Sequence, residues 1–201
     1  MKTITKLKLL THGGALLPLL WLFWDYFNHQ LTVNPIQAAM QRTGKTAIVL
    51  LMLTLACTPI YILFKYKPVL GLRRMLGLYT FFYASLHLTI YVGLDYGFNW
   101  ESIFQNLYEK QYIYIGFAAF LILAILAITS FRWWMKKLGK NWKRLHRLVY
   151  LAGILVVLHY AWVKKGDLFA LQGDIIGPLL FGILLIALLI VRLPVLRQSH
   201  R

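Results

Sequence analysis

The chain alternates between long apolar runs and short segments that contain most of its charged and turn-forming residues. Each run covers about 20 residues, which is the length of helix that a bilayer requires. The runs predict membrane-spanning helices at about 9 to 27, 46 to 64, 75 to 94, 112 to 130, 145 to 163 and 174 to 193. Because the connecting segments are short, neighbouring helices are expected to be antiparallel. The pattern predicts an all-α integral membrane bundle of six transmembrane helices, with residues 1–201 forming a single domain.

Composition agrees with this picture. Of the 201 residues, 60% are hydrophobic and 14% are charged, whereas soluble domains contain about 45–50% apolar residues. A soluble globular fold is thus excluded. The N-terminus resembles a secretory signal because Lys2, Lys6 and Lys8 precede an apolar run. That run is too long for a signal peptide and lacks a cleavage site of small residues, so we expect it to remain as the first helix.

The charged residues are divided unequally between the two sides of the predicted bundle. The chain contains 22 Lys and Arg residues and 6 Asp and Glu residues. Six spans place both termini on one side, which receives 17 of the basic residues, while all 6 acids fall on the other side. Since Lys and Arg are enriched in cytoplasmic loops, both termini are predicted to be cytoplasmic, in a multi-pass protein of a bacterial inner membrane. The basic residues then face membrane lipid, and no nucleic-acid partner is expected.

Histidines are the candidate chemical groups inside the predicted spans. No Asp, Glu, Lys or Arg falls at the middle of any span, whereas His87 and His159 lie inside the third and fifth spans. These two spans run in the same direction, and the histidines lie roughly 10 and 6 Å from the outer ends, at similar depth. Neutral imidazole suits the axial ligation of haem iron in an apolar environment because it adds no charge. The alternative is that each histidine is a packed, hydrogen-bonded core residue.

His146 and Cys57 further limit the chemistry. His146 lies 13 residues before His159, about 20 Å lower along the same helix, which is the scale of two haems stacked across a bilayer. On an ideal helix the two side chains point about 140° apart, so they need not face one cleft. Cys57 is the single cysteine, which excludes a disulfide within the chain and covalent CxxCH attachment of haem. Redox chemistry would therefore require a noncovalently held cofactor.

Arginines gather at the predicted cytoplasmic ends of the third and fifth spans. Arg73, Arg74, Arg144 and Arg147 could pair with haem propionates or a flavin phosphate, because guanidinium binds such anions in bidentate geometry. The alternative is that they anchor the helix ends. The sequence contains no GxGxxG or P-loop motif, so hydride chemistry is expected on another protein. No internal repeat is apparent in the sequence.

Several short motifs between about residues 9 and 165 together carry a family resemblance. They are His12 with Leu16, Leu17, Pro18 and Trp21; Asn34-Pro35; Thr43 to Ala47; Leu53 to Leu55 with Thr58-Pro59; Arg73 to Leu78; His87-Leu88 with Tyr91; Leu138 to Lys140; Leu145-His146; Tyr150-Leu151; and His159-Tyr160. In this combination the chain resembles the MsrQ family of haem-binding membrane subunits. These belong to periplasmic protein-methionine-sulfoxide reductase systems and to the ferric-reductase-like transmembrane superfamily.

The resemblance implies a b-type cytochrome with one or two haem b groups and with FMN. It also implies a cytoplasmic flavin reductase or quinol as electron donor, and the periplasmic molybdopterin-containing reductase MsrP as acceptor, in the repair of oxidised proteins. By position, His87, His146 and His159 match the family's haem ligands. Relatives with two haems carry a second histidine on the third span, 13 or 14 residues from the first, where this chain has Arg73, Arg74, Trp100 and Glu101. His12, on the first span, is a candidate ligand opposite His146 by depth.

Two other functions remain open from the sequence. A quinol-linked or flavin-linked ferric reductase would use the same haem with a different donor or acceptor. A small transporter or channel would use the histidines to bind substrate or protons, although the lack of carboxylates at mid-membrane counts against it.

Overall fold

The computed structural model describes residues 3–164 and 175–192, and every regular element within these ranges is a helix. The elements are α1 (Thr3–Phe27), α2 (Pro35–Phe64), η1 (Lys67–Leu72), α3 (Arg73–Thr89), η2 (Ile90–Asp95), α4 (Trp100–Glu109), α5 (Gln111–Ile128), α6 (Arg132–Leu138), α7 (Lys140–Leu145), α8 (Leu148–Val163) and α9 (Ile176–Ile190). η1 is a 3-10 helix that leads into α3, and η2 is a π-helical segment that continues it. The predicted all-α fold is confirmed.

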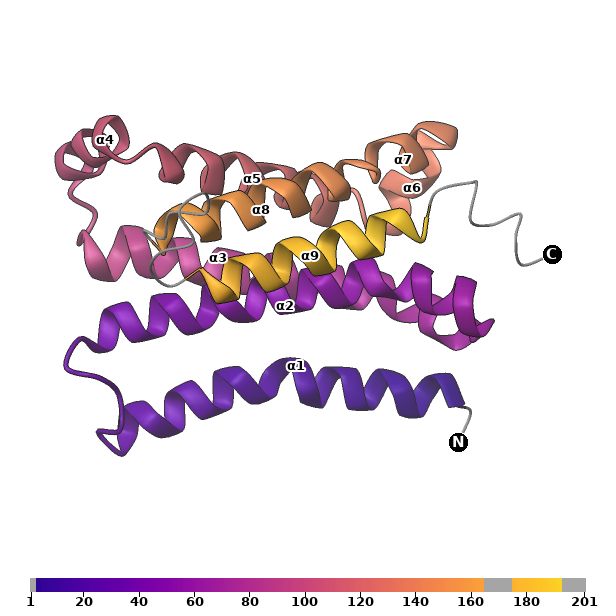
Figure 1. Ribbon diagram of the computed structural model, residues 1–201, viewed down its shortest axis with the longest axis horizontal. Helices are drawn as coiled ribbons and strands as arrows, with labels where there is room; N and C mark the ends of the chain where they lie inside the picture. The colour runs from indigo at the N-terminus through magenta and orange to yellow at the C-terminus, as the bar shows by residue number, and fades with distance from the viewer. Residues whose placement is uncertain (1–2, 165–174, 193–201) are drawn as a thin grey trace.

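The long helices lie side by side along one axis (Figure 1). α1 forms one edge of the bundle, α5 and α8 form the other, and α2, α3 and α9 lie between them. Successive long helices run in opposite directions, so the start of α1 and the end of α9 lie at the same end, which we call the terminal end. Helix α4 and the turn between α1 and α2 lie at the opposite end, which we call the α4 end.

The helices match the predicted spans in number and order. Within the described residues, five segments are long and apolar enough to cross a membrane: Ile4–Phe27, Pro35–Phe64, Lys67–Asp95, Gln111–Ile128 and Lys140–Val163. The sixth predicted span corresponds to α9, a shorter apolar helix of 15 residues. Its predicted limits, 174 and 193, lie outside the described residues. The chain is thus a multi-pass membrane protein, as predicted.

α2 begins 11 residues before the predicted second span. Asn34 caps it, with the side-chain Oδ1 accepting a hydrogen bond from the backbone N–H of Gln37 at 3.0 Å, and Pro35 occupies the first turn. Both features are common at helix starts. The apolar pattern places Arg42 and Lys45 in a loop because it detects only the most hydrophobic part of the helix. In the structure both cations lie within α2.

The connections contain short helices that the apolar pattern does not predict. α4 starts at a cap formed by Asn99, whose Oδ1 accepts a hydrogen bond from the Ser102 N–H at 3.0 Å. At the terminal end, α6 and α7 are joined by Gly139, whose φ of 49° is a left-handed value that favours glycine. The fifth predicted span, 145 to 163, therefore begins at the last residue of α7 and continues through a turn that contains His146 into α8.

α2 is the central helix of the bundle. It contributes to three clusters of buried apolar side chains, one shared with α1, η1 and α3, one with α8 and α9, and one with α5 and α8. The most extensive helix pairs are α2 with α3 and α5 with α8. These two pairs position the histidines.

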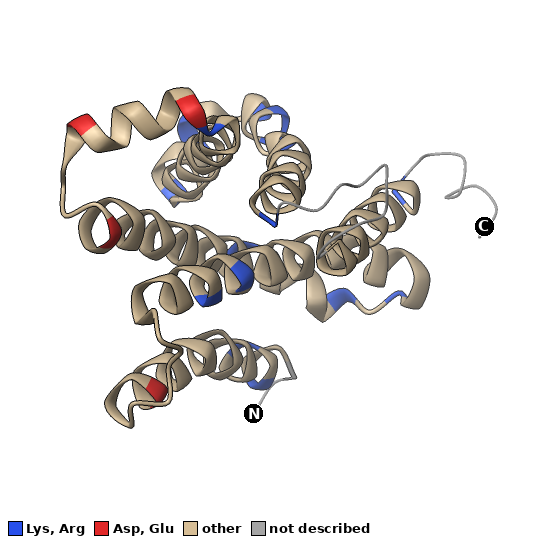
Figure 2. Cartoon of the chain, turned by 60° about the vertical axis from the view of Figure 1, so that its left-hand side comes forward, with Lys and Arg blue, Asp and Glu red and all other residues tan. Residues whose placement is uncertain are grey.

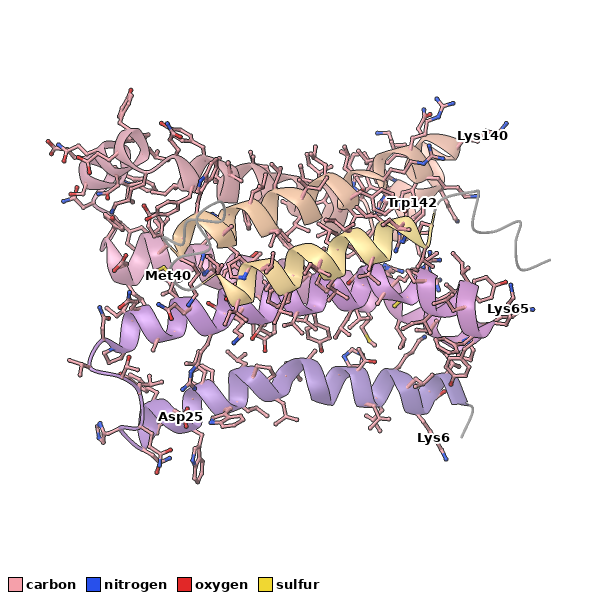
Figure 3. All side chains as sticks on the ribbon, in the orientation of Figure 1. Lys6, Asp25, Met40, Lys65, Lys140 and Trp142 are labelled. Atoms are coloured by element: carbon pink, nitrogen blue, oxygen red, sulfur yellow. The ribbon has the colours of Figure 1, made fainter. Side chains whose placement is uncertain are left out.

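Acidic residues of the described part lie at the α4 end: Asp25, Asp95, Glu101 and Glu109 (Figure 2). Lys6 and Lys140 lie at the terminal end (Figure 3). Asp167 and Asp174, which are predicted to accompany the other acids, lie outside the described residues. The described charges therefore separate along the bundle as the sequence predicts.

Candidate functional site

His87 on α3 and His159 on α8 face each other inside the bundle. Their ring centroids are 6.3 Å apart, and the ring planes are inclined at 85°. The sequence predicts only that the two histidines have similar depth. The structure brings them together.

A backbone carbonyl of a neighbouring helix holds each ring. The Nδ1 of His87 lies 2.8 Å from the carbonyl oxygen of Met40 on α2, and the Nδ1 of His159 lies 2.8 Å from that of Tyr112 on α5. A carbonyl oxygen only accepts hydrogen bonds, so the proton of each neutral ring is on Nδ1. The lone pair is then on Nε2. This arrangement fixes the tautomer and orientation of a metal-ligating histidine.

Glycine allows both of these close approaches. A Cβ added to Gly44 would lie 3.0 Å from the Nδ1 of His87, and one added to Gly116 would lie 2.6 Å from the Nδ1 of His159. Each glycine follows the carbonyl-bearing residue by four positions, which is about one helical turn. Both imidazoles therefore lie directly against helix backbone.

The two halves of the site have the same local geometry. The set formed by Met40, Gly44 and His87 recurs 72 residues later as the set Tyr112, Gly116 and His159. In both sets the histidine follows the residue that supplies the carbonyl by 47 positions. The helix pairs α2–α3 and α5–α8 run in the same directions (Figure 1), so the two sets are arranged in parallel. This is a recurrence of local geometry, and the sequence itself shows no clear internal repeat. Only glycine and histidine are identical in the two sets, because any residue can supply the carbonyl.

The spacing of the two rings fits a metal ligated from both sides. An imidazole nitrogen lies about 2 Å from its metal, so two imidazoles on opposite sides of one metal have ring centroids about 6 Å apart. The observed separation of 6.3 Å agrees with this value. Within the described ranges, no group of three or more His, Cys, Asp or Glu side chains could hold a bare ion. The pair therefore suits haem, whose porphyrin supplies the remaining ligands.

His146 occupies a separate place near the terminal end. Its ring stacks on that of Trp142 with centroids 4.0 Å apart, and its Nδ1 lies 3.2 Å from the Trp142 carbonyl oxygen. The indole N–H of Trp142 in turn donates to the carbonyl oxygen of Thr129 at 2.8 Å. The Nε2 of His146 is buried and has no hydrogen bond of normal geometry among the described residues. Met40, which holds His87, and Trp142 lie toward opposite ends of the bundle (Figure 3).

The structure does not bring His12 to His146. The Nδ1 of His12 lies 2.7 Å from the hydroxyl of Tyr79 on α3, and the two rings meet edge to face with centroids 5.6 Å apart. α1, which carries His12, and α8 lie on opposite sides of α2 in both ribbon views (Figures 1 and 2). His12 therefore forms part of the contact between α1 and α3.

The four candidate arginines lie at the terminal end and are exposed. Arg73 donates from Nε to the carbonyl oxygen of Leu70 at 3.3 Å and from Nη1 to the hydroxyl of Thr58 at 3.2 Å. Arg74, Arg144 and Arg147 lie near the starts of α3 and α8. Their placement is compatible both with anion binding and with anchoring at the membrane surface.

Arg192 is a further polar residue that the sequence did not single out. Its Nη1 donates to the hydroxyl of Tyr150 at 2.6 Å, and its Nη2 donates to the carbonyl oxygen of Leu55. The guanidinium also lies over the Tyr150 ring, 5.0 Å from the centroid. Arg192 thus joins the end of α9 to α8 and α2. A basic residue that directly follows a long apolar run is the signal that could have identified it.

Comparison with known proteins agrees with this geometry. The family model for the ferric reductase like transmembrane component matches residues 43–157, a range that contains Gly44, His87, Gly116 and His146. The chain is 44% identical over 167 residues to the protein-methionine-sulfoxide reductase heme-binding subunit MsrQ of Xanthomonas axonopodis pv. citri, covering 80% of this chain and 77% of the relative. It is 41% identical over 188 residues to the MsrQ subunit of Bordetella pertussis, covering 94% and 89% respectively.

Proposed function

Because this chain belongs to the MsrQ family of ferric-reductase-like transmembrane proteins, we propose that it is a b-type cytochrome that passes electrons across the inner membrane to MsrP. The facing pair of His87 and His159 carries this proposal. The two rings have a separation that suits two ligands of one iron, and both Nε2 atoms are left for the metal. Relatives described as heme-binding subunits MsrQ share at least 41% of their aligned residues with this chain.

In this proposal the residues of the chain hold haem b and tune it. Bound haem would supply reversible one-electron oxidation and reduction. His87 and His159 would hold the haem iron through their ring nitrogens, and the carbonyls of Met40 and Tyr112 would keep each ring in the orientation and tautomer that ligation needs. Gly44 and Gly116 leave room for those rings. The surrounding apolar helices exclude water, which influences the reduction potential.

The charge distribution suggests the direction of transfer. Most Lys and Arg residues are predicted at the terminal end, which would be cytoplasmic by the positive-inside rule. Electrons would then enter near His146 from a cytoplasmic flavin reductase or from quinol, and would leave near the α4 end. The molybdopterin-containing MsrP would accept them there and reduce methionine sulfoxide in periplasmic proteins.

The terminal end offers candidate contacts for further cofactors. His146 has a buried Nε2 that could ligate a second haem, while His12 is engaged with Tyr79 on the other side of α2. Arg73, Arg74, Arg144 and Arg147 would pair with haem propionates or with the phosphate of FMN, since guanidinium suits both anions. Haem and FMN stoichiometry of the purified protein would establish how many of these contacts are used.

Spectroscopy of histidine variants tests the central proposal. We expect the purified protein to show the Soret and α bands of a reduced b-type cytochrome, and His87→Ala or His159→Ala to lose the spectrum of a haem with two histidine ligands. His29→Ala is the matched control, because His29 lies beyond the end of α1 and is exposed. If His87→Ala and His159→Ala both kept the spectrum of the unaltered protein, ligation by this pair would be refuted. Reduction by a quinol analogue without a flavoprotein would identify quinol as a donor.

A further inference from the structure

A groove separate from the histidine pair runs between α1 and α2. Its volume is about 790 Å³, within the range of about 300–1,000 Å³ found for small-molecule sites. One wall is a face of α1 that extends from Leu7 past Gly14 to Trp21, and the other is a face of α2 that extends from Arg42 to Ile60. Fourteen residues separate Leu7 from Trp21, so the α1 wall is about 21 Å long.

The two ends of this groove differ in polarity. Arg42 and Lys45 line it at the α4 end, together with Trp21. Arg42 is ion-paired with Asp25 at 2.5 Å, whereas Lys45 has no such partner among the described residues and is exposed. One net positive charge therefore remains at this end. Apolar side chains line the opposite end: Leu7, Leu10, Ile60, Val69 and Leu72.

The cations lie where they can reach the headgroup region of a bilayer. α2 has 30 residues, so it is about 45 Å long and extends about 7 Å beyond each side of a 30 Å hydrocarbon layer if it is centred. The backbone of Arg42 then lies about 3 Å inside the hydrocarbon boundary, and that of Lys45 about 8 Å inside. Long basic side chains at such depths extend back toward the interface. Trp21 adds the amphipathic ring that is common at that level.

The shape and charge of the groove indicate its occupant. An amphiphile with an anionic head and a long hydrocarbon tail matches a groove that is cationic at one end and apolar along the rest. We propose that this groove binds one anionic glycerophospholipid, with its phosphate at Lys45 and Arg42 and an acyl chain along α1 toward Leu7. Nothing in this proposal depends on haem.

Two adjacent glycines provide a matched pair of variants. A Cβ added to Gly13 or Gly14 meets no atom within 4 Å, so either position has room for a side chain. Only Gly14 belongs to the groove lining. Gly14→Leu should therefore place a side chain in the groove and narrow it, whereas Gly13→Leu should leave it open. Lys45→Gln removes the unpaired charge, and Lys110→Gln, in the turn between α4 and α5, removes a charge away from the groove.

The experiment is native mass spectrometry of the full chain released from nanodiscs of phosphatidylglycerol or of phosphatidylcholine. We expect one retained phosphatidylglycerol and little retained phosphatidylcholine. Lys45→Gln should lower retention of phosphatidylglycerol about fivefold, as expected for one basic residue near the membrane surface, and Gly14→Leu should also lower it. Gly13→Leu and Lys110→Gln should retain the lipid as the unaltered chain does.

Three results would overturn the proposal. Equal retention of the two lipids would show that the cations do not select an anionic head. Undiminished retention in Gly14→Leu would place the lipid elsewhere. A dimer without bound phospholipid would mean that a second copy of the chain covers the groove. Because the readout counts phospholipid, a failure here is distinguishable from a failure of the proposed haem ligation, which the histidine spectra report.

Discussion

Gly116→Ala tests whether the close contact between α5 and the ring of His159 matters for haem binding. The added Cβ would lie 2.6 Å from Nδ1, 2.7 Å from Cε1 and 3.2 Å from Cγ, whereas ordinary contact begins at 3.4 Å. The ring must therefore move away from α5 by about 0.8 Å. The hydrogen bond from Nδ1 to the Tyr112 carbonyl, 2.8 Å long, would then stretch to at most about 3.6 Å, which is beyond hydrogen-bond distance.

The loss of this hydrogen bond is expected to weaken haem binding more than it weakens the fold. Removing an outer partner of a metal-ligating histidine costs about 10- to 100-fold in metal affinity. The fold loses about 1 kcal/mol from the hydrogen bond but regains a similar amount because alanine is the better helix former. Haem retention and the reduction potential should therefore change, while the thermal unfolding midpoint of the haem-free protein changes little.

Gly77→Ala is the control for this prediction. A Cβ at Gly77 on α3 would meet only Thr54 Cγ2, at 3.8 Å, which is an ordinary contact. The assay is titration of purified haem-free protein with haem, followed by absorbance, together with a redox titration of the loaded protein. If Gly116→Ala matched Gly77→Ala in haem affinity and in potential, the contact would have no functional importance and the reasoning would be refuted.

Two further predictions concern stability. Tyr83→Phe removes the hydrogen bond that the Tyr83 hydroxyl donates to the Ala15 carbonyl oxygen at 2.6 Å. Because Tyr83 is only 1% exposed, we expect the free energy of unfolding to fall by about 1–3 kcal/mol. Thermal unfolding compared with the control Tyr108→Phe, at an exposed tyrosine, checks this, and equal midpoints for the two variants would contradict it. Asn34→Ala removes the cap of α2 and should cost about 1 kcal/mol. Asn34→Asp should retain most of that stability, and an Asn34→Asp as unstable as the alanine variant would argue against capping.

Hydropathy predicts the bundle well because a bilayer requires long apolar helices whatever their packing. It places His87 and His159 at similar depth for the same reason, since depth follows from the position in the span. It does not predict the start of α2, because the first turns of that helix are polar and extend beyond the hydrocarbon layer. As a result, hydropathy assigns Arg42 and Lys45 to a loop, although in the structure they belong to α2 and line the groove beside α1.

The supports of the histidine pair were harder to predict than the pair itself. The carbonyls of Met40 and Tyr112 accept the hydrogen bonds, and a backbone carbonyl is present at every residue, so no residue type marks it. Gly44 and Gly116 can be recognised as supports only when the histidine ring that packs against each of them is known. Contacts between elements also decide the place of His12, whose interaction with Tyr79 depends on how α1 packs against α3.

The recurrent geometry of the site turns the prediction at Gly116 into a graded test. Gly44 has the same role beside His87, but there the added Cβ would lie 3.0 Å from Nδ1 instead of 2.6 Å. The ring of His87 must therefore move by about 0.4 Å, half the displacement at His159. Its hydrogen bond to Met40 would stretch from 2.8 Å to at most about 3.2 Å, the long limit of a normal hydrogen bond. We expect haem affinity to fall in the order Gly77→Ala, Gly44→Ala, Gly116→Ala, measured in the same titration. A larger loss for Gly44→Ala than for Gly116→Ala would show that ring displacement does not control ligation, even if both variants bound haem more weakly than the unaltered chain.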